Sequence, residues 1–88
     1  MRVPDVLYTT HFNRAYKKIS NELKLQIDER EQYFLADCFD IRLKTHKLSG
    51  KLEGLWAFSI TQKHRILFTF EEDGMVTFLD IDDHDLYR

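Results

Sequence analysis

Histidine, arginine and tyrosine side chains late in this 88-residue chain are the groups that could carry out acid–base chemistry on a phosphate. A histidine has an unperturbed pKa of ~6.5, so it can serve as a general acid or a general base near neutral pH. The guanidinium of arginine presents a fixed fork of donors to phosphate oxygens. RNA cleavage by the 2′-hydroxyl needs a base, an acid and cations beside the phosphate. These residue types therefore make metal-independent RNA cleavage a candidate activity.

The first candidates lie in a basic loop and at the turn that follows it. His46 precedes the predicted sheet and would act as an acid, a base or a phosphate contact; a solvated loop histidine is the alternative. Lys63 and His64 occupy a tight turn, where turn polarity alone would explain them. Arg65 alternates with Ile66 along a predicted strand, so we expect its side chain on the face opposite the aromatic residues. That position is harder to explain by surface polarity.

The remaining candidates, His84 and Tyr87, follow the last predicted strand. Neighbouring carboxylates in Asp82-Asp83-His84-Asp85 favour the protonated form of His84. A histidine held only by local hydrogen bonds is the alternative. Tyr87 could stack on a base, donate a proton or pack against the end of the chain.

Other kinds of site fit the sequence less well. A zinc site built from the four histidines, His11, His46, His64 and His84, would lack any pair of ligands close in sequence. The acidic stretch 80–85 lacks the glycine turn and the distal glutamate of an EF-hand loop. A single cysteine, Cys38, excludes an internal disulfide and indicates a cytosolic protein. We therefore predict no metal ion and no cofactor.

Charge is unevenly distributed along the chain. The formal net charge is −2, which argues mildly against a nucleic-acid partner. By segment, however, residues 1–40 carry −1, residues 41–70 carry +5 and residues 71–88 carry −6. Because electrostatic fields act over a Debye length of ~8 Å, the central block can attract phosphates despite the acidic total. A solvated surface whose sign is incidental is the alternative.

Composition excludes several classes of protein. Hydrophobic residues make up 43% of the chain and aromatic residues 14%, which is too rich for a disordered protein. No apolar run approaches the ~20 residues of a membrane-spanning helix. The first residues lack the apolar core of a signal peptide, so we expect a cytoplasmic protein. The length predicts a single domain, residues 1–88.

The first half of the chain predicts a strand and two helices. Residues 3–9 read as a strand with Pro4 near its start. Thr10 is the expected N-cap of a helix, and apolar residues recur every three or four positions after it. Ser20 and Asn21 indicate a corner and a second N-cap. We favour a helical hairpin, although one bent helix fits the same pattern.

The second half predicts an antiparallel sheet. Residues 37–53 lack periodicity and are expected to be irregular and basic. Residues 56–61, 65–70 and 75–81 then alternate as strands, and Asp73-Gly74 is a strong hairpin signal. The order β-α-α-β-β-β indicates an α+β fold in which helices cover one face of an antiparallel sheet and the other face is free for a groove.

Four stretches of the sequence resemble a known family. The chain resembles the RelE/ParE toxin superfamily, and its two histidine-bearing regions are most similar to the YafQ-type branch. The stretches are Leu43-Lys44-Thr45-His46-Lys47-Leu48-Ser49-Gly50-Lys51-Leu52, Gly54-Leu55-Trp56-Ala57-Phe58-Ser59-Ile60, His64-Arg65-Ile66-Leu67-Phe68 and Leu79-Asp80-Ile81-Asp82-Asp83-His84-Asp85-Leu86-Tyr87.

The resemblance implies a toxin of a type II toxin–antitoxin pair, active as a ribosome-dependent endoribonuclease that cleaves mRNA. It implies a cognate antitoxin as partner, with DNA bound only indirectly through the antitoxin complex and no membrane partner. By position, the implied catalytic histidines are His46 and His84, and Lys63 and His64 are further active-site residues. Arg65 matches the arginine that holds the scissile phosphate, and Tyr87 matches the C-terminal aromatic residue.

Two features depart from the family pattern. Ribonuclease toxins of this family are usually basic overall, and this chain is not. Ile81-Asp82 stands where Ile-Gly is common, and the added carboxylate would weaken phosphate binding. The rival interpretation is therefore a non-enzymatic or degenerate toxin, either similar to gyrase poisons or acting only as a partner of its antitoxin.

Overall fold

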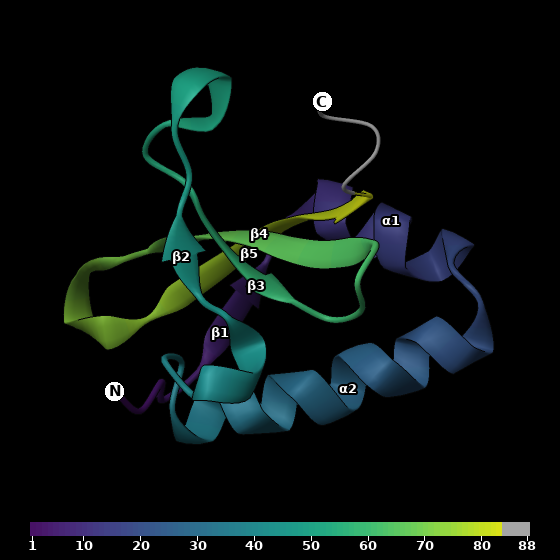
Figure 1. The fold of residues 1–88 in the computed structure, drawn as a ribbon, viewed down its shortest axis with the longest axis horizontal. Helices are drawn as coiled ribbons and strands as arrows, with labels where there is room; N and C mark the ends of the chain where they lie inside the picture. Colours follow the sequence, from purple (N-terminus) through teal and green to yellow (C-terminus); the bar gives the residue numbers. More distant parts are fainter. Residues whose placement is uncertain (84–88) are drawn as a thin grey trace.

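The computed structural model describes residues 1–83, which form a sheet and two helices (Figure 1). The helices are α1 (Thr10–Lys18) and α2 (Asn21–Ala36). The strands lie in the order β1-β5-β4-β3-β2. Their bounds are β1 (Val6–Tyr8), β2 (His46–Lys47), β3 (Trp56–Ser59), β4 (His64–Phe70) and β5 (Val76–Asp83), with 3₁₀ turns at Ile41–Leu43, Gly50–Leu52 and Glu72–Gly74.

The predicted α+β class is confirmed, and the helices begin where short polar side chains cap them. The hydroxyl of Ser20 accepts a hydrogen bond from the backbone N–H of Leu23 at 3.1 Å, so α2 starts separately, as predicted. The hydroxyl of Thr9 accepts from the N–H of Phe12 at 3.0 Å. The prediction of Thr10 as the first cap was therefore wrong by one position, because Thr9 has the extended backbone that a cap requires.

β1 is the one strand whose pairing direction differs from the prediction. It pairs with β5 in parallel, with Val6 opposite Val76 and Tyr8 opposite Phe78, so the sheet is mixed rather than wholly antiparallel. The hairpins β3–β4 and β4–β5 are antiparallel as expected. A local pattern reveals hairpins, but the direction of a strand paired with one some seventy residues later is set only by the tertiary fold.

A further strand, β2, lies inside the segment predicted to be irregular. It pairs antiparallel with β3, with His46 opposite Ala57 and Lys47 opposite Trp56. Two polar residues give no detectable alternation, which is why the sequence does not reveal this edge strand. The pairing attaches the basic segment to the sheet and fixes the position of His46.

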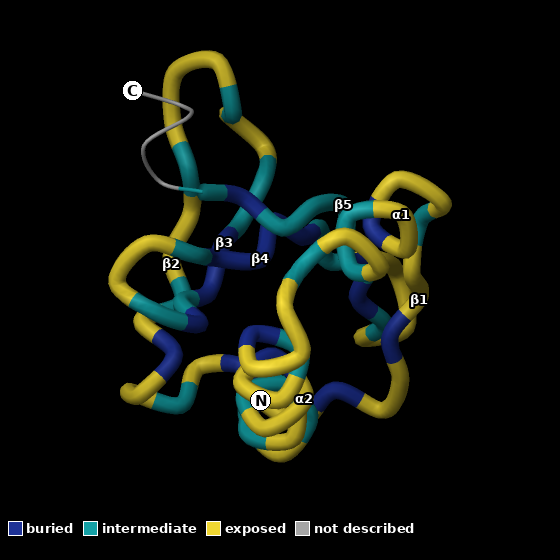
Figure 2. The backbone as a smooth tube through the Cα atoms, turned by 90° about the vertical axis from the view of Figure 1, so that its right-hand side faces the viewer, coloured by how far each residue is buried: buried dark blue, intermediate teal, exposed yellow. Residues whose placement is uncertain are grey.

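An aromatic core joins α2 to the covered face of the sheet. Phe34 is fully buried, and its ring centroid lies 4.6 Å from that of Phe58 and 5.0 Å from that of Phe68. Figure 2 shows the buried positions concentrated along β3 and β4 and the exposed positions on the outer side of α2. On the opposite face of the sheet Ala57 and Leu67 are also buried, so that face is only partly open. No helix among residues 1–83 has the length and apolarity needed to span a membrane.

Candidate functional site

A cleft of about 460 Å³ opens where α2, the 41–43 turn and the β3–β4 hairpin meet. Its described lining contains six basic or imidazole side chains and no carboxylate. It brings together three of the six predicted site residues, His46, His64 and Arg65. The full lining is Arg30, Arg42, Lys44, His46, Ser59, Ile60, Thr61, Gln62, His64 and Arg65.

The imidazole of His46 is held by the backbone just before it. Its Nδ1 lies 2.8 Å from the carbonyl oxygen of Lys44. A carbonyl can only accept, so in the neutral ring Nδ1 carries the proton and donates it. The Nε2 atom is then an unprotonated nitrogen on an exposed side chain, as a general base requires.

Sheet register places His46 and Arg65 on the same face. His46 is opposite Ala57, and Arg65 is opposite Ser59, two residues further along β3. Positions two apart on a strand share a face. The predicted orientation of Arg65 away from the aromatic core is therefore confirmed, because neither Ala57 nor Arg65 belongs to the core cluster.

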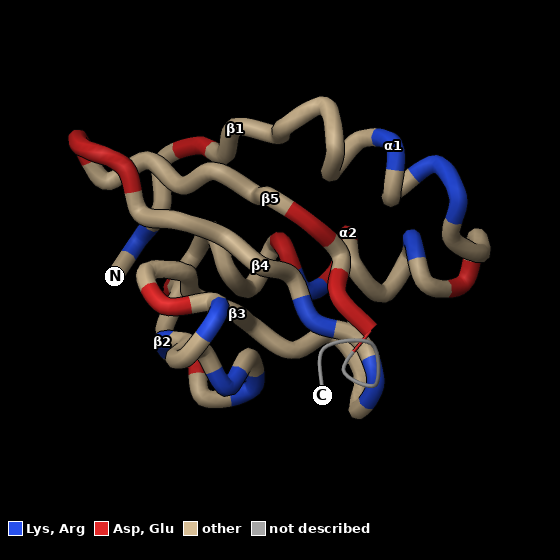
Figure 3. The backbone as a smooth tube through the Cα atoms, turned by 90° about the horizontal axis from the view of Figure 1, so that it is seen from above, with Lys and Arg blue, Asp and Glu red and all other residues tan. Residues whose placement is uncertain are grey.

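The guanidinium of Arg65 forms a buried ion pair. Its Nε donates to Oδ2 of Asp82 at 2.6 Å, and the Asp82 side chain is fully buried. Figure 3 shows acidic positions on β5 running beside a basic position near the start of β4. The carboxylate that departs from the family pattern thus contacts the arginine implied to hold the phosphate.

Thr61 organises the turn that carries Lys63 and His64. Its hydroxyl accepts hydrogen bonds from the backbone N–H of Lys63 at 3.1 Å and of His64 at 3.0 Å. It also lies 3.0 Å from Nδ1 of His64. The His64 ring lines the cleft, whereas Lys63 lines a neighbouring hollow at the start of α2. Turn polarity therefore explains part of this motif, as the alternative interpretation stated.

Two further arginines in the cleft were not singled out from the sequence. Arg30, on α2, donates to the carbonyl of Arg42 at 2.9 Å. Arg42 forms a two-pronged contact with Asp40, at 3.0 and 2.7 Å, and its guanidinium lies 3.7 Å from the ring centroid of Tyr33. Hydrogen bonds from Arg42 lower the pKa of Asp40 to about 2. The available signal was Arg30 itself, a basic residue that stands between the acidic residues Glu29 and Glu31 in the sequence.

Two predicted site residues, His84 and Tyr87, lie outside the described residues. Within residues 1–83, no group of three or more histidine, cysteine, aspartate or glutamate side chains is arranged to hold a metal ion. His11 instead pairs with Asp80, with Nε2 and Oδ1 3.1 Å apart.

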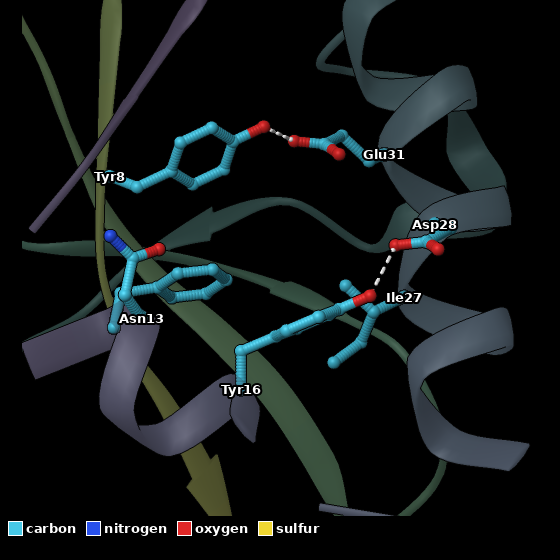
Figure 4. Close-up of a pocket in the computed structure, with 7 residues that line it drawn as sticks. Tyr8, Asn13, Tyr16, Ile27, Asp28 and Glu31 are labelled. Carbon is cyan, nitrogen blue, oxygen red and sulfur yellow. Dashed lines mark hydrogen bonds between the residues drawn. The ribbon is translucent and has the colours of Figure 1, made fainter. Parts of the chain in front are cut away.

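A second hollow of about 230 Å³ lies between β1, α1 and α2 (Figure 4). The hydroxyl of Tyr8 donates to Glu31, and the hydroxyl of Tyr16 donates to Asp28 at 3.0 Å. Burial raises the pKa of Glu31 and of both tyrosines, and the hydrogen bonds to carboxylates raise the tyrosine pKa values further. Sequence reasoning assigned these residues no functional role.

Solved structures of toxins share this fold over nearly their whole length. A YoeB/ParE toxin from Agrobacterium tumefaciens is 18% identical, with 96% of this chain and 99% of that chain covered and a TM-score of 0.74. The RelE of an archaeal RelE–RelB complex from Pyrococcus horikoshii is 13% identical over 96% and 97% of the two chains, with a TM-score of 0.75.

The chain has the RelE/ParE toxin fold. The fold implied by the resemblance is thereby confirmed, and YafQ shares it: a chain of the E. coli DinJ–YafQ toxin–antitoxin complex is 14% identical over 99% and 98% of the two chains, with a TM-score of 0.69. No protein-family model and no curated protein sequence matches the chain. At these identities the likeness to the solved RelE/ParE toxins concerns the fold, so chemistry has to be argued from the cleft.

Proposed function

We propose that this chain is the toxin of a type II toxin–antitoxin pair and that it cleaves mRNA on the ribosome. The observation that carries the proposal is the cleft, where the His46 imidazole and Arg65 share one face of the sheet and the described lining residues include no carboxylate. The complexes of RelE with RelB and of YafQ with DinJ support an antitoxin as partner. DNA would be bound only through that complex, in the cytoplasm.

The proposed reaction uses the chain's own side chains. His46 Nε2 accepts the proton of the 2′-hydroxyl, whose oxygen attacks phosphorus and forms a 2′,3′-cyclic phosphate. The 5′-oxygen leaves with a proton from His84, whose acidic neighbours favour its protonated form. Arg65 stabilises the charge on the phosphate oxygens together with His64, which lines the same cleft, and Lys63 adds positive charge from the neighbouring hollow. Tyr87 aids positioning or proton transfer.

One observation favours the rival function, a non-enzymatic or degenerate toxin. Both Arg42 and Arg65 are paired with carboxylates, Asp40 and Asp82, which reduces the positive charge available to a phosphate. Such a protein would bind its antitoxin without cutting RNA, or would inhibit growth by another route.

Induced expression in bacteria distinguishes the two functions. The wild type, His84→Ala and His46→Ala are expressed, growth is followed, and mRNA ends on ribosomes are mapped. We expect growth arrest and new mRNA ends with the wild type, and at least a 100-fold loss of ends with either variant. His11→Ala is the matched histidine control and should keep activity, because His11 lies on α1 outside the cleft.

The outcomes separate cleanly. Growth arrest with intact mRNA contradicts the nuclease and supports a toxin of another kind. If neither the wild type nor any variant arrests growth, the result supports a degenerate toxin. Equal cleavage by the wild type and both histidine variants would contradict the assigned roles of His46 and His84.

A further inference from the structure

Asp82 is a buried carboxylate next to the cleft that the proposed reaction does not use. It lies directly opposite Arg65 in the β4–β5 register, and its Oδ2 accepts the Nε–H of Arg65 at 2.6 Å. Its other oxygen, Oδ1, is buried and has no hydrogen-bond partner among the described residues. A buried carboxylate with an unpaired oxygen is costly, so stability alone does not account for it.

The ion pair with Asp82 uses the Nε atom of Arg65 and not its two terminal Nη nitrogens. Only Nε is engaged, and no described residue accepts a hydrogen bond from either terminal Nη nitrogen. The guanidinium is planar, so a bond at Nε fixes the plane and direction of its two Nη groups. Arg65 also lines the cleft while its side chain is only 11% exposed.

We propose that Asp82 is a positioning residue that holds the Arg65 guanidinium with its Nη fork directed at an RNA phosphate in the cleft. The inference rests on the proposed function for its ligand, a phosphodiester. A freely rotating arginine would have to be ordered on binding, whereas this one is fixed beforehand. The negative charge of Asp82 opposes phosphate binding, and the fixed direction of the fork outweighs that opposition.

Two substitutions of Asp82 distinguish its effect on the orientation of Arg65 from the effect of its negative charge. Asp82→Asn keeps an oxygen that accepts from Nε but removes the charge, whereas Asp82→Ala removes both. Binding of a fluorescent single-stranded RNA oligonucleotide to the full-length protein is measured by anisotropy at fixed salt. We expect Asp82→Asn to bind as tightly as the wild type or more tightly, and Asp82→Ala to bind about tenfold more weakly.

Asp80→Ala is the matched control. It removes the same charge from the same face of β5, two residues away, and Asp80 pairs with His11 rather than with Arg65. We expect no loss of RNA affinity for Asp80→Ala. In an Arg65→Gln background, Asp82→Ala should have no further effect, because a positioning residue acts only through its arginine.

A measurement on the wild type keeps the test decisive if Asp82→Ala folds poorly. The ¹⁵N resonance of the Arg65 Nε–H is followed by NMR during titration with the same RNA. We expect the Nε–H to keep its hydrogen-bonded shift while the Nη signals move. Loss of the Nε–H bond on RNA binding, tighter RNA binding by Asp82→Ala than by the wild type, or no RNA binding by the wild type would each overturn the inference. If the variants bind RNA in the expected pattern but mRNA in cells stays uncut, the proposed nuclease activity is contradicted and the positioning role of Asp82 is not.

Discussion

The imidazole Nδ1 of His46 lies 2.8 Å from the carbonyl oxygen of Lys44, so the local backbone determines which ring nitrogen carries the proton. Lys44 has a left-handed conformation, with φ 52° and ψ 41°, at the end of the 41–43 turn. This conformation precedes β2, whose pairing with β3 fixes His46 on the sheet. A short irregular segment thereby presents Nε2 as the basic nitrogen.

The first prediction concerns the tautomer of His46. In the neutral ring the proton should reside on Nδ1, which ¹⁵N NMR of the imidazole nitrogens reports directly. His11 serves as an internal control with the other tautomer. Its Nε2 lies 3.1 Å from Oδ1 of Asp80, so in His11 we expect the proton on Nε2. A His46 ring protonated on Nε2 when neutral would contradict the role of this nitrogen as the base.

A second prediction concerns Lys44, which has the left-handed backbone conformation and whose carbonyl accepts the hydrogen bond from His46. A residue with a Cβ atom in the left-handed region costs about 1–2 kcal/mol, and glycine avoids the cost. Lys44→Gly should therefore leave the free energy of unfolding unchanged or raise it. Lys44→Val should lower it by about 1–2 kcal/mol, because a β-branched side chain fits the left-handed region worse than the unbranched lysine does. Urea denaturation measures both. Equal stability of the two variants would show that the left-handed conformation is not maintained.

Much of this fold could be predicted because its signals are local. The Ser20 cap, the Asp73-Gly74 hairpin and the orientation of Arg65 each depend on residues close in sequence. The turn residues Asp73 and Gly74 do have positive φ, at 67° and 77°. These local conformations are kept in the folded chain because they agree with the packing of α2 on the sheet.

Most of the unpredicted contacts join residues that are not neighbours in the sequence, and the Thr9 cap is the local exception. The parallel pairing of β1 with β5, the strand β2 and the contact of Arg30 with the Arg42 carbonyl bring together residues that no sequence pattern links. The Arg65–Asp82 pair is the instructive case. Asp82 was recognised as a departure from the family pattern, but its contact with Arg65 required the β4–β5 register, which pairs them across the sheet.

A third prediction concerns the aromatic core. Phe34→Ala removes a fully buried ring that packs against Phe58 and Phe68 and should lower the free energy of unfolding by about 3–5 kcal/mol. That is a large part of the roughly 4–13 kcal/mol expected for a domain of this size. Leu25→Ala, on the same helix but 71% exposed, should change stability by less than about 0.5 kcal/mol. Similar losses for both variants would contradict the packing of α2 on the sheet.

A fourth prediction tests the boundary between the helices. Ser20→Ala removes the acceptor for the Leu23 N–H and should cost about 1 kcal/mol. Ser49 precedes the 50–52 turn without making a side-chain capping bond, so Ser49→Ala should be close to neutral. Chemical denaturation of both variants measures the difference. An equal effect of the two substitutions would show that Ser20 does not start α2 through its side chain.

The last prediction concerns pH and the hollow between β1, α1 and α2. Burial raises the pKa of Glu31 above its usual 4.5, so the folded protein binds this proton more tightly than the unfolded chain. The contribution of Glu31 to stability therefore rises as pH falls through the folded-state pKa and levels off below about 4.5. At neutral pH the ionised carboxylate is a net cost, although Tyr8 partly offsets it by donating a hydrogen bond.

Glu31→Gln should therefore raise the melting temperature at pH 7, because the amide oxygen still accepts from Tyr8 and no charge is buried. Glu31 is only partly buried, so solvent screens the effect and the rise should stay below about 4 °C. The difference from wild type should shrink as pH approaches 4.5, since protonated glutamate and glutamine are then alike. Glu53→Gln, at an exposed loop position, is the control and should leave the melting temperature at pH 7 close to that of the wild type. The prediction is contradicted if Glu31→Gln is less stable than the wild type at pH 7 and equally stable in acid. That result would mean that the charged carboxylate of Glu31 stabilises the folded protein.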